Sequence, residues 1–171
     1  LRLQGALDAA ALQRALTRVV GRHDSLRTTF AAGEDGQPRQ VVMQPEAARF
    51  APAFEVLLGA DENSLKAQVA VWLSEPFDLA AGPLFRARLI HVAEDEHVLL
   101  MGGHHTVLDG WSVGLLLNEI SALYREAVSG APAALPDLVV QYADYAAWQR
   151  KVLSGERLGE ETAWWRTTLA G

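Results

Sequence analysis

Cysteine is absent from this chain of 171 residues. Its absence excludes a disulfide framework, a thiolate metal site and a cysteine nucleophile, and it fits a reducing compartment. Basic residues are also few, because 15 Lys and Arg stand against 21 Asp and Glu, for a formal net charge of −6. No run of Lys and Arg exceeds a pair. The electrostatic footprint of a nucleic-acid-binding protein is therefore missing, and we expect no nucleic-acid partner.

Long apolar segments are missing as well. No uncharged apolar run approaches the ~18 residues typical of a membrane-spanning helix. The chain also does not begin with a basic region followed by an apolar core, which is the pattern of a secretory leader. We therefore expect a soluble cytoplasmic protein without membrane association. The first residue is Leu1 rather than methionine, which leads us to expect a piece of a longer polypeptide.

Hydrophobic residues make up 50% of the chain, enough for a compact domain with a core. Their spacing alternates between the periods of strands and helices, which predicts an α/β fold. The turn signal Gly33 to Gly36 predicts a hairpin. The predicted strands span 1–3, 26–30, 37–43, 54–58, 84–91 and 98–101. Helices are predicted between Asp8 and Gly21, between Asp61 or Ser64 and Pro76, over about 113–128, from Pro136–Asp137 onward, and around 160–169.

The most informative stretch runs from His104 to Gly110, where an apolar strand meets an amphipathic helix. It holds two adjacent histidines, His104 and His105, followed by Asp109. An imidazole with a pKa of about 6.5 can take or give a proton near neutral pH, and a neighbouring carboxylate can orient it or balance its charge. Gly110 leaves a backbone N–H open to close approach. A reaction centre can be built from these groups.

Strand geometry limits how this centre can work. Consecutive side chains of a strand point to opposite faces, so only one of His104 and His105 addresses a small substrate if the strand continues through them. In the preceding strand both the even-numbered and the odd-numbered residues are apolar, so the alternation of side chains does not show which histidine faces the substrate. Metal binding is disfavoured, because adjacent histidines diverge and no third ligand follows at helical spacing. The alternative that stays open is a strand-end histidine satisfied by backbone carbonyls, with Asp109 merely capping the helix.

Three further stretches accompany this motif. They run from Arg22 to Phe30, from Phe77 to Arg86 and from Gln141 to Gln149, and Trp111-Ser112 extends the motif itself. Together the four stretches resemble, in sequence and order, the condensation domains of nonribosomal peptide synthetases, which belong to the chloramphenicol acetyltransferase-like superfamily. The resemblance covers nearly the whole chain.

This resemblance implies a chloramphenicol acetyltransferase-like lobe, an α+β two-layer sandwich with a mixed sheet and helices packed on one face. Such a domain has two similar lobes with the active site in a tunnel between them. We expect residues 1–171 to form the N-terminal lobe, without its extreme N-terminus and without the C-terminal lobe. By itself this lobe is expected to be inactive.

The implied reaction is amide bond formation between two aminoacyl or peptidyl thioesters held on carrier proteins. By the resemblance, His105 faces the tunnel and takes a proton from the acceptor amine or positions it, with His104 beside it. Asp109 pairs with an arginine that lies either in the C-terminal lobe or in this chain, where Arg22 and Arg27 are candidates. Gly110 lets a backbone N–H approach the reacting carbonyl. Trp111 and Ser112 are expected to contact substrate, and Arg22, His23 and Arg27 form a structural motif.

No cofactor is expected to bind this lobe, since the phosphopantetheine arms belong to the carrier domains. The implied partners are the donor and acceptor peptidyl carrier domains, the C-terminal lobe and a neighbouring adenylation domain. Three other functions stay open. They are an epimerisation domain, a catalytically silent condensation-like recruitment domain, and a free-standing acyltransferase acting on coenzyme A thioesters. Trp111-Ser112 favours condensation over epimerisation, and the intact histidine motif argues against a catalytically silent domain.

Overall fold

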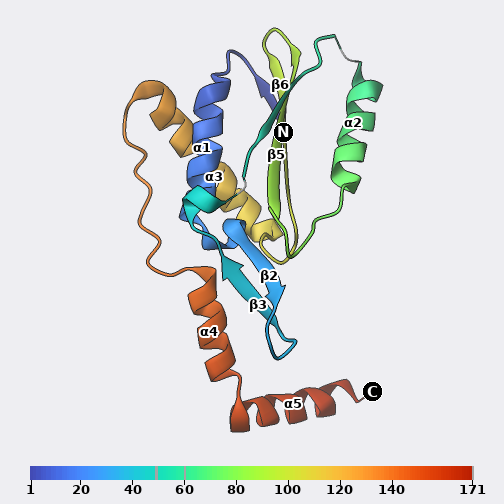
Figure 1. Cartoon of the computed structure of the whole chain (residues 1–171), viewed down its shortest axis with the longest axis vertical. Helices are drawn as coiled ribbons and strands as arrows, with labels where there is room; N and C mark the ends of the chain where they lie inside the picture. Colours follow the sequence, from blue (N-terminus) through green and yellow to red (C-terminus); the bar gives the residue numbers. More distant parts are fainter. Residues whose placement is uncertain (49, 60, 171) are drawn as a thin grey trace. The chain divides into compact units, whose positions relative to one another are not determined.

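A computed structural model describes residues 1–48, 50–59 and 61–170 (Figure 1). The chain divides into two compact units, Leu1–Asp137 and Leu138–Gly171. The strands are β1 (Arg2–Gln4), β2 (Thr28–Ala32), β3 (Pro38–Val42), β4 (Ala53–Val56), β5 (Phe85–Ala93) and β6 (Glu96–Gly103). The helices are α1 (Ala9–Arg22), α2 (Glu62–Ser74), α3 (Gly110–Ser129), α4 (Tyr142–Val152) and α5 (Gly155–Leu169).

The first unit is built on a four-stranded sheet with the order β1-β6-β5-β4. β5 and β6 form an antiparallel hairpin, β1 is antiparallel to β6, and β4 is parallel to β5. This combination confirms the predicted mixed sheet. β2 and β3 form the predicted hairpin as a separate two-stranded sheet. The strand expected at 26–30 begins at Thr28, because Asp24–Arg27 form a short 3₁₀ helix.

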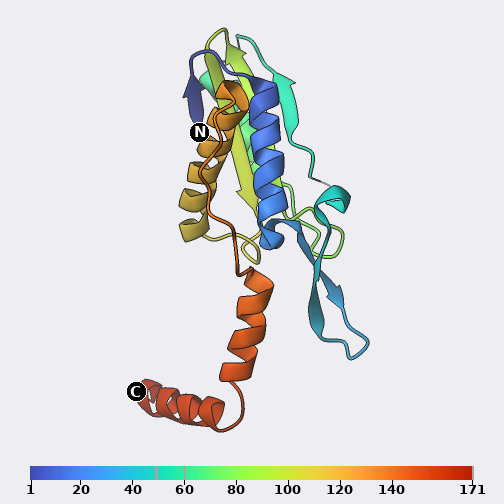
Figure 2. The same cartoon turned by 90° about the vertical axis from the view of Figure 1, so that its left-hand side faces the viewer.

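Helices cover both faces of the main sheet, which corrects the prediction that they pack on one face. Alternate β5 residues from Phe85 to Leu89 lie in a core with α1 and α3. Ile90 and Val92 face the other way and pack with Leu65 and Trp72 of α2. Figure 1 shows α2 on the side opposite α1 and α3, and Figure 2 shows α1 and α3 side by side. The second face needs a cover because it also carries apolar side chains, whose removal from water stabilises the fold.

The capping residues decide where the helices begin and end. Asp8 accepts a hydrogen bond from the Ala11 N–H (2.8 Å) at the start of α1, and Asp61 does the same for Ser64 N–H (2.8 Å) in α2. The prediction that Gly21 ends the first helix is wrong, since α1 continues to Arg22 and is capped by His23 in an extended conformation. A glycine ends a helix when it adopts a left-handed conformation, as Gly130 does after α3 with φ of 75°.

The second unit contains α4 and α5, neither of which has a buried residue. The helical region expected from Pro136–Asp137 begins instead at Tyr142. There the side chain of Gln141 and the carboxylate of Asp144 form a reciprocal capping box, which satisfies N–H groups that have no partner within the helix. Of the helices among the described residues, none has both the length and the apolar character needed to cross a lipid bilayer.

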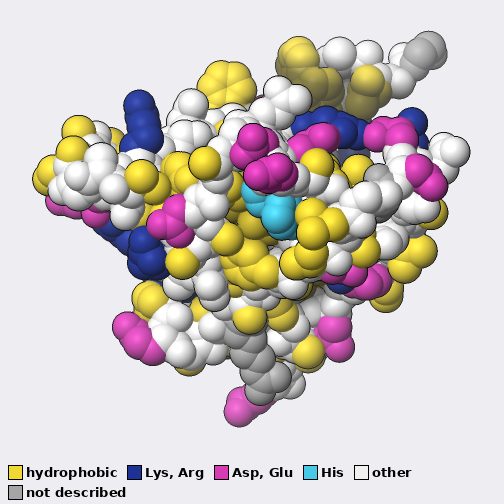
Figure 3. All heavy atoms as spheres, turned by 90° about the horizontal axis from the view of Figure 1, so that it is seen from above, with side chains coloured by type: hydrophobic (Ala, Val, Ile, Leu, Met, Phe, Trp, Pro, Cys, Tyr) yellow, Lys and Arg dark blue, Asp and Glu magenta, His cyan; other side chains and the backbone are white. Residues whose placement is uncertain are grey.

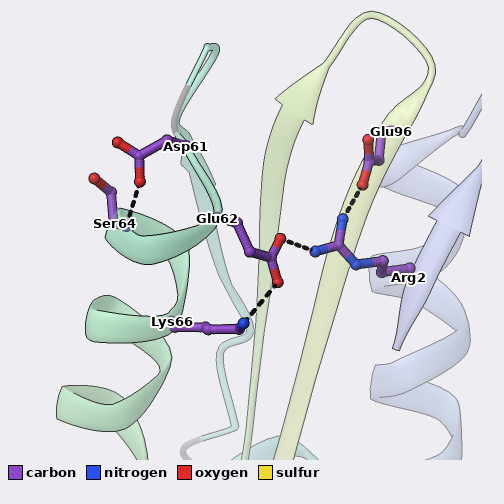
Figure 4. A network of polar contacts seen from close by, with 6 residues as sticks. All are labelled: Arg2, Asp61, Glu62, Ser64, Lys66 and Glu96. Atoms are coloured by element: carbon purple, nitrogen blue, oxygen red, sulfur yellow. Dashed lines mark hydrogen bonds and ion pairs between the residues drawn. The ribbon is translucent and has the colours of Figure 1, made fainter.

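A surface network ties the edge of the sheet to α2 (Figure 4). The guanidinium of Arg2 on β1 forms ion pairs with Glu96 of β6 and Glu62 of α2. Glu62 also lies 3.6 Å from the Lys66 ammonium. Hydrogen bonds from Arg2 lower the pKa of the Glu62 carboxyl. Because these side chains are largely exposed, water and salt screen the pairs and their contribution to stability is small.

Candidate functional site

The two histidines of the motif lie just beyond the end of a strand. β6 ends at Gly103, and His104 to Val107 form a turn in which the Val107 N–H donates to the His104 carbonyl (2.9 Å). The His104 N–H donates back to the Leu84 carbonyl (2.9 Å), which fastens the turn to the residue before β5. The strand therefore does not continue through the histidines, and their directions are set by this turn.

His104 is the anchored member of the pair. Its ring is half-buried and meets the ring of Phe77 edge to face, with centroids 6.1 Å apart and an interplanar angle of 82°. The backbone N–H of Thr106 donates to Nδ1 of His104 (3.3 Å), and the Thr106 hydroxyl lies 3.0 Å from the same nitrogen. Because a backbone N–H can only donate, Nδ1 is the acceptor, and the proton of the neutral ring resides on Nε2.

His105 is the accessible member of the pair. The residue is exposed, and no hydrogen bond or ion pair connects its ring to any described residue. A substrate can reach this imidazole without displacing a protein contact. The structure thus distinguishes the surroundings of two residues that strand periodicity left equivalent.

Asp109 is the N-cap of α3. Its carboxylate accepts hydrogen bonds from the Ser112 N–H (2.8 Å) and from the Ser112 hydroxyl (2.6 Å). These bonds lower the pKa of Asp109, and the nearby charge of His105 lowers it further, so the carboxylate is ionised at neutral pH. An ionised carboxylate therefore lies near the exposed His105.

Neither arginine proposed as the partner of Asp109 lies against it. Arg22 donates to the Glu119 carboxylate (3.1 Å) and to the Pro136 carbonyl (2.8 Å). Arg27 forms an ion pair with Asp24 and donates to the Met43 carbonyl. Among the described residues, Asp109 therefore has no arginine partner, and its carboxylate caps α3 through Ser112.

Within the Arg22, His23 and Arg27 motif, the first two residues hold the end of α1 in place. Nε2 of His23 lies 2.9 Å from the same Glu119 oxygen that Arg22 contacts, so both residues connect α1 to α3. Burial raises the pKa of Glu119, but the hydrogen bonds from His23 and Arg22 outweigh this effect and the pKa is lowered. These contacts lie within the protein, in keeping with the predicted structural role.

The first turn of α3 presents open space beside the histidines. A Cβ added to Gly110 meets no atom within 4 Å, and the Trp111 side chain is 81% exposed. Gly103 differs, because a Cβ there would lie 2.9 Å from Cδ2 of Leu108. The close approach of Leu108 therefore requires glycine at 103, whereas nothing in the described residues requires it at 110.

Three residues behind the turn were not singled out for a functional role from the sequence. Phe77 contacts His104, and the guanidinium of Arg86 lies over the rings of both Phe77 and Trp72. Phe77 and Arg86 bound one of the stretches that carry the family resemblance, so a signal was present. Its spatial meaning depends on the contact between Phe77 and His104, which are 27 positions apart in the sequence.

Comparisons with known proteins agree with this geometry. The family model "Condensation domain" matches residues 1–171. The chain is 42% identical over 175 residues to malpinin synthetase of Mortierella alpina, an alignment that covers 100% of this chain and 2% of that synthetase.

Solved structures agree as well. The X-domain from teicoplanin biosynthesis superposes with a TM-score of 0.85 at 33% identity, covering 99% of this chain and 37% of that chain. The epimerization domain from the third module of tyrocidine synthetase B superposes with a TM-score of 0.83 at 26% identity, covering 99% of this chain and 39% of that chain. These likenesses confirm the predicted chloramphenicol acetyltransferase-like fold, and the chain spans well under two thirds of the length of each of these relatives.

Proposed function

The chain belongs to the condensation domain family, and we propose that it is the N-terminal, motif-bearing lobe of a domain that forms amide bonds in nonribosomal peptide synthesis. In this proposal the extreme N-terminus and the C-terminal lobe of the domain lie outside the chain. The observation that supports the proposal best is the contrast within the histidine pair. His104 is anchored by Phe77 and Thr106, while the His105 ring is exposed beside an ionised carboxylate.

In the proposed reaction the amine nitrogen of an acceptor aminoacyl thioester attacks the carbonyl carbon of a donor thioester. The C–N bond forms, the C–S bond breaks, and the donor carrier leaves as a thiol. The nitrogen loses one proton, which His105 accepts or directs toward the leaving sulfur. General base catalysis contributes ~10²–10⁴-fold. Because a thioester is already activated, alignment of the two substrates by His105 supplies a further part of the rate enhancement.

The residues around His105 have supporting roles in this proposal. Asp109 holds the first turn of α3 through Ser112, and its charge stabilises the imidazolium that forms when His105 takes a proton. The open space at Gly110 lets the reacting carbonyl approach the backbone, where an N–H can stabilise the oxyanion. Trp111 is exposed enough to contact a bound substrate.

The proposed partners follow from this reaction. Donor and acceptor carrier domains deliver the two thioesters on phosphopantetheine arms, which act here as substrates rather than as cofactors of the lobe. The C-terminal lobe closes the site over His105, and an adenylation domain loads the carriers. Acting alone, the lobe is proposed to be inactive, because it leaves the His105 ring open to solvent on the substrate side.

Epimerisation is the second candidate. The observation that favours it is the superposition on an epimerization domain at 26% identity with a TM-score of 0.83. In that reaction His105 would move a proton at the α-carbon of a single carrier-bound residue, and no second thioester would be consumed. The number of thioesters consumed therefore distinguishes the two reactions.

The experiment uses the complete two-lobed domain that contains this chain, with loaded donor and acceptor carriers, and follows carrier-bound products by mass spectrometry. We expect a product whose mass is the sum of donor and acceptor acyl groups, and a fall of ~10²-fold or more in its rate for His105→Ala. Lys66→Ala, exposed on α2, is the matched control and should keep the parent rate.

Each result has a defined meaning. Unchanged turnover of His105→Ala would exclude His105 from the mechanism. Chiral analysis of the hydrolysed product tests the second candidate. If the donor residue is stereochemically inverted and no condensed product forms, the reaction is epimerisation rather than condensation. No reaction on either substrate, with carriers still bound, would favour a recruitment role.

A further inference from the structure

Arg86 of β5 lies over two aromatic rings behind the motif. Its guanidinium carbon lies 4.8 Å from the ring centroid of Trp72 and 4.4 Å from that of Phe77. The side chain is 20% exposed, and partial removal from water strengthens the attraction between a cation and the faces of aromatic rings. Arg86 therefore fixes the distance between α2, which carries Trp72, and the segment that carries Phe77.

The same guanidinium closes the C-terminus of α2. It donates to the carbonyl oxygens of Trp72 (2.8 Å) and Glu75 (2.7 Å), and it lies 3.2 Å from the Glu75 carboxylate. The last carbonyl groups of a helix lack partners within the helix and carry partial negative charge. Arg86 supplies these partners, and it thereby sets the direction in which the chain leaves α2 toward Phe77.

Gly102 of β6 leaves room for this arrangement. It lies directly opposite Arg86 in the β5–β6 register, and a Cβ at this position would lie 3.2 Å from Cη2 of Trp72. Without a side chain at 102, the indole can lie close to the sheet on one side of the guanidinium. Gly102 comes two residues before His104, so the contacts of Arg86 and Trp72 lie at the same end of β6 as the histidine motif.

Phe77 carries the effect of Arg86 to the motif. The ring of Phe77 has Arg86 over its face and the edge-to-face contact with His104 described above. His104 in turn fixes the turn through its carbonyl and its Nδ1 atom. A shift of the Phe77 ring would therefore tilt His104, turn the backbone at 104–107 and change the direction of His105.

We propose that Arg86 is a positioning residue for the His104–His105 turn, acting through Phe77. The activity readout of this proposal rests on the function proposed above, whereas its spectroscopic readout does not. A purely structural role, in which Arg86 only closes α2, would change stability without changing the environment of the His104 ring. The two roles can thus be separated.

The experiment compares Arg86→Met, Arg86→Lys and Phe77→Leu in the complete two-lobed domain, with Arg88→Met as the matched control. Arg88 lies on the same strand and face, but its ion pair is with Glu55 of β4 at 3.4 Å. Thermal unfolding, the NMR signals of the His104 imidazole and the kcat and KM of amide formation are measured for each variant. Phe77→Leu is included because it leaves the contacts of Arg86 with α2 in place.

For Arg86→Met and Phe77→Leu we expect shifted His104 signals and a kcat about tenfold lower at similar KM, since a misplaced catalytic group loses alignment more than binding. The variant that combines Arg86→Met with Phe77→Leu should have a kcat no lower than that of either single variant. Arg86→Lys should recover part of kcat, and Arg88→Met should match the parent. Parent-like His104 signals in folded Arg86→Met and Phe77→Leu would overturn the proposal. A parent domain that forms no amide would overturn only the proposed function, because the NMR comparison remains decisive.

Discussion

The imidazole of His91 stacks on that of His97 across the β5–β6 hairpin, with ring centroids 4.3 Å apart and an interplanar angle of 8°. Nε2 of His91 and Nδ1 of His97 are buried without a hydrogen-bond partner. Burial lowers the pKa of His97 below 6.5, the charge of His91 lowers it further, and Asp95 acts in the opposite direction. Figure 3, which views the end of the molecule with the β5–β6 turn, shows imidazole atoms among acidic and apolar side chains.

This pair predicts a loss of stability in mild acid. Because the pKa of His97 is lower in the folded state, the unfolded state binds more protons, so the free energy of unfolding falls as the pH drops below roughly 6.5. Denaturant unfolding at about pH 7.5 and about pH 5.5 measures this change. His97→Phe, which keeps a ring against His91 but cannot be protonated, should show a smaller change than the parent. Equal changes in the two proteins would contradict the assignment to His97.

Asp109 offers a test of capping against charge. Asp109→Ala removes the acceptor for Ser112 and should lower the unfolding temperature by a few degrees. Asp109→Asn keeps an acceptor oxygen but removes the charge beside His105, and we expect near-parent stability with slower amide formation. Asp8→Ala is the matched control, because it removes an equivalent cap from α1 far from the motif in the sequence. It should lower stability without slowing the reaction of the remaining folded protein. Parent-like activity of Asp109→Asn would restrict Asp109 to capping.

The glycines on either side of the turn should respond in opposite ways to alanine. Gly103→Ala forces a Cβ against Leu108 at 2.9 Å, and overpacking of this kind costs ~1–3 kcal/mol. Gly110→Ala has open space in α3 and should leave stability unchanged or raise it by ~0.4–1 kcal/mol, because alanine loses less backbone entropy in a helix. Denaturant unfolding checks both variants. If Gly110→Ala is fully stable but forms amide more slowly, glycine at 110 is needed for the approach of substrate and not for folding.

Glu119 should contribute more to stability than the surface network around Arg2. Glu119→Gln weakens hydrogen bonds from Arg22 and His23, and bonds of this kind to a charged group contribute ~1.5–3 kcal/mol. The exposed Glu62→Gln variant should have a smaller effect. Because the pKa of Glu119 is lowered from 4.5, its contribution is present above about pH 4.5 and is lost as the pH falls through the folded-state value. Unfolding curves at neutral and acidic pH test whether Glu119→Gln lowers the free energy of unfolding more than Glu62→Gln does.

Short-range chemistry made much of the fold predictable. Asp8, Asp61 and Asp109 cap the helices as expected, because the acceptor and its N–H lie three residues apart. The hairpin of β2 and β3 follows from its glycine-bounded turn. The placement of α2 on the second face was missed, because Arg86 and Arg88 are charged at the start of that face of β5, while Ile90 and Val92 farther along the same face need an apolar cover.

The site was predictable in its members and not in its arrangement. The motif residues were found by their order, and the family resemblance singled out His105. The different surroundings of His104 and His105 depend on where β6 ends and on Phe77, which lies 27 positions before His104. Within the described residues Asp109 bonds to Ser112, while Arg22 and Arg27 bond elsewhere, so an arginine partner from the C-terminal lobe stays a prediction. The contacts of Arg22 with Glu119 and of Arg27 with Met43 join segments far apart in the sequence, and they leave no local periodicity to read.

The short pairing of β1 with β6 also affects how this chain behaves in solution. The ladder runs from Gln4↔Glu96 to Arg2↔Val98 and closes with the bonds between Leu1 and Leu99. Beyond Leu99, within the described residues, no strand lies on that side of β6, so the peptide groups of Met101 and Gly103 form an open border of the sheet. Borders of this kind readily accept a strand from another molecule. Concentrated samples of the chain alone should therefore self-associate, which light scattering at increasing concentration would reveal.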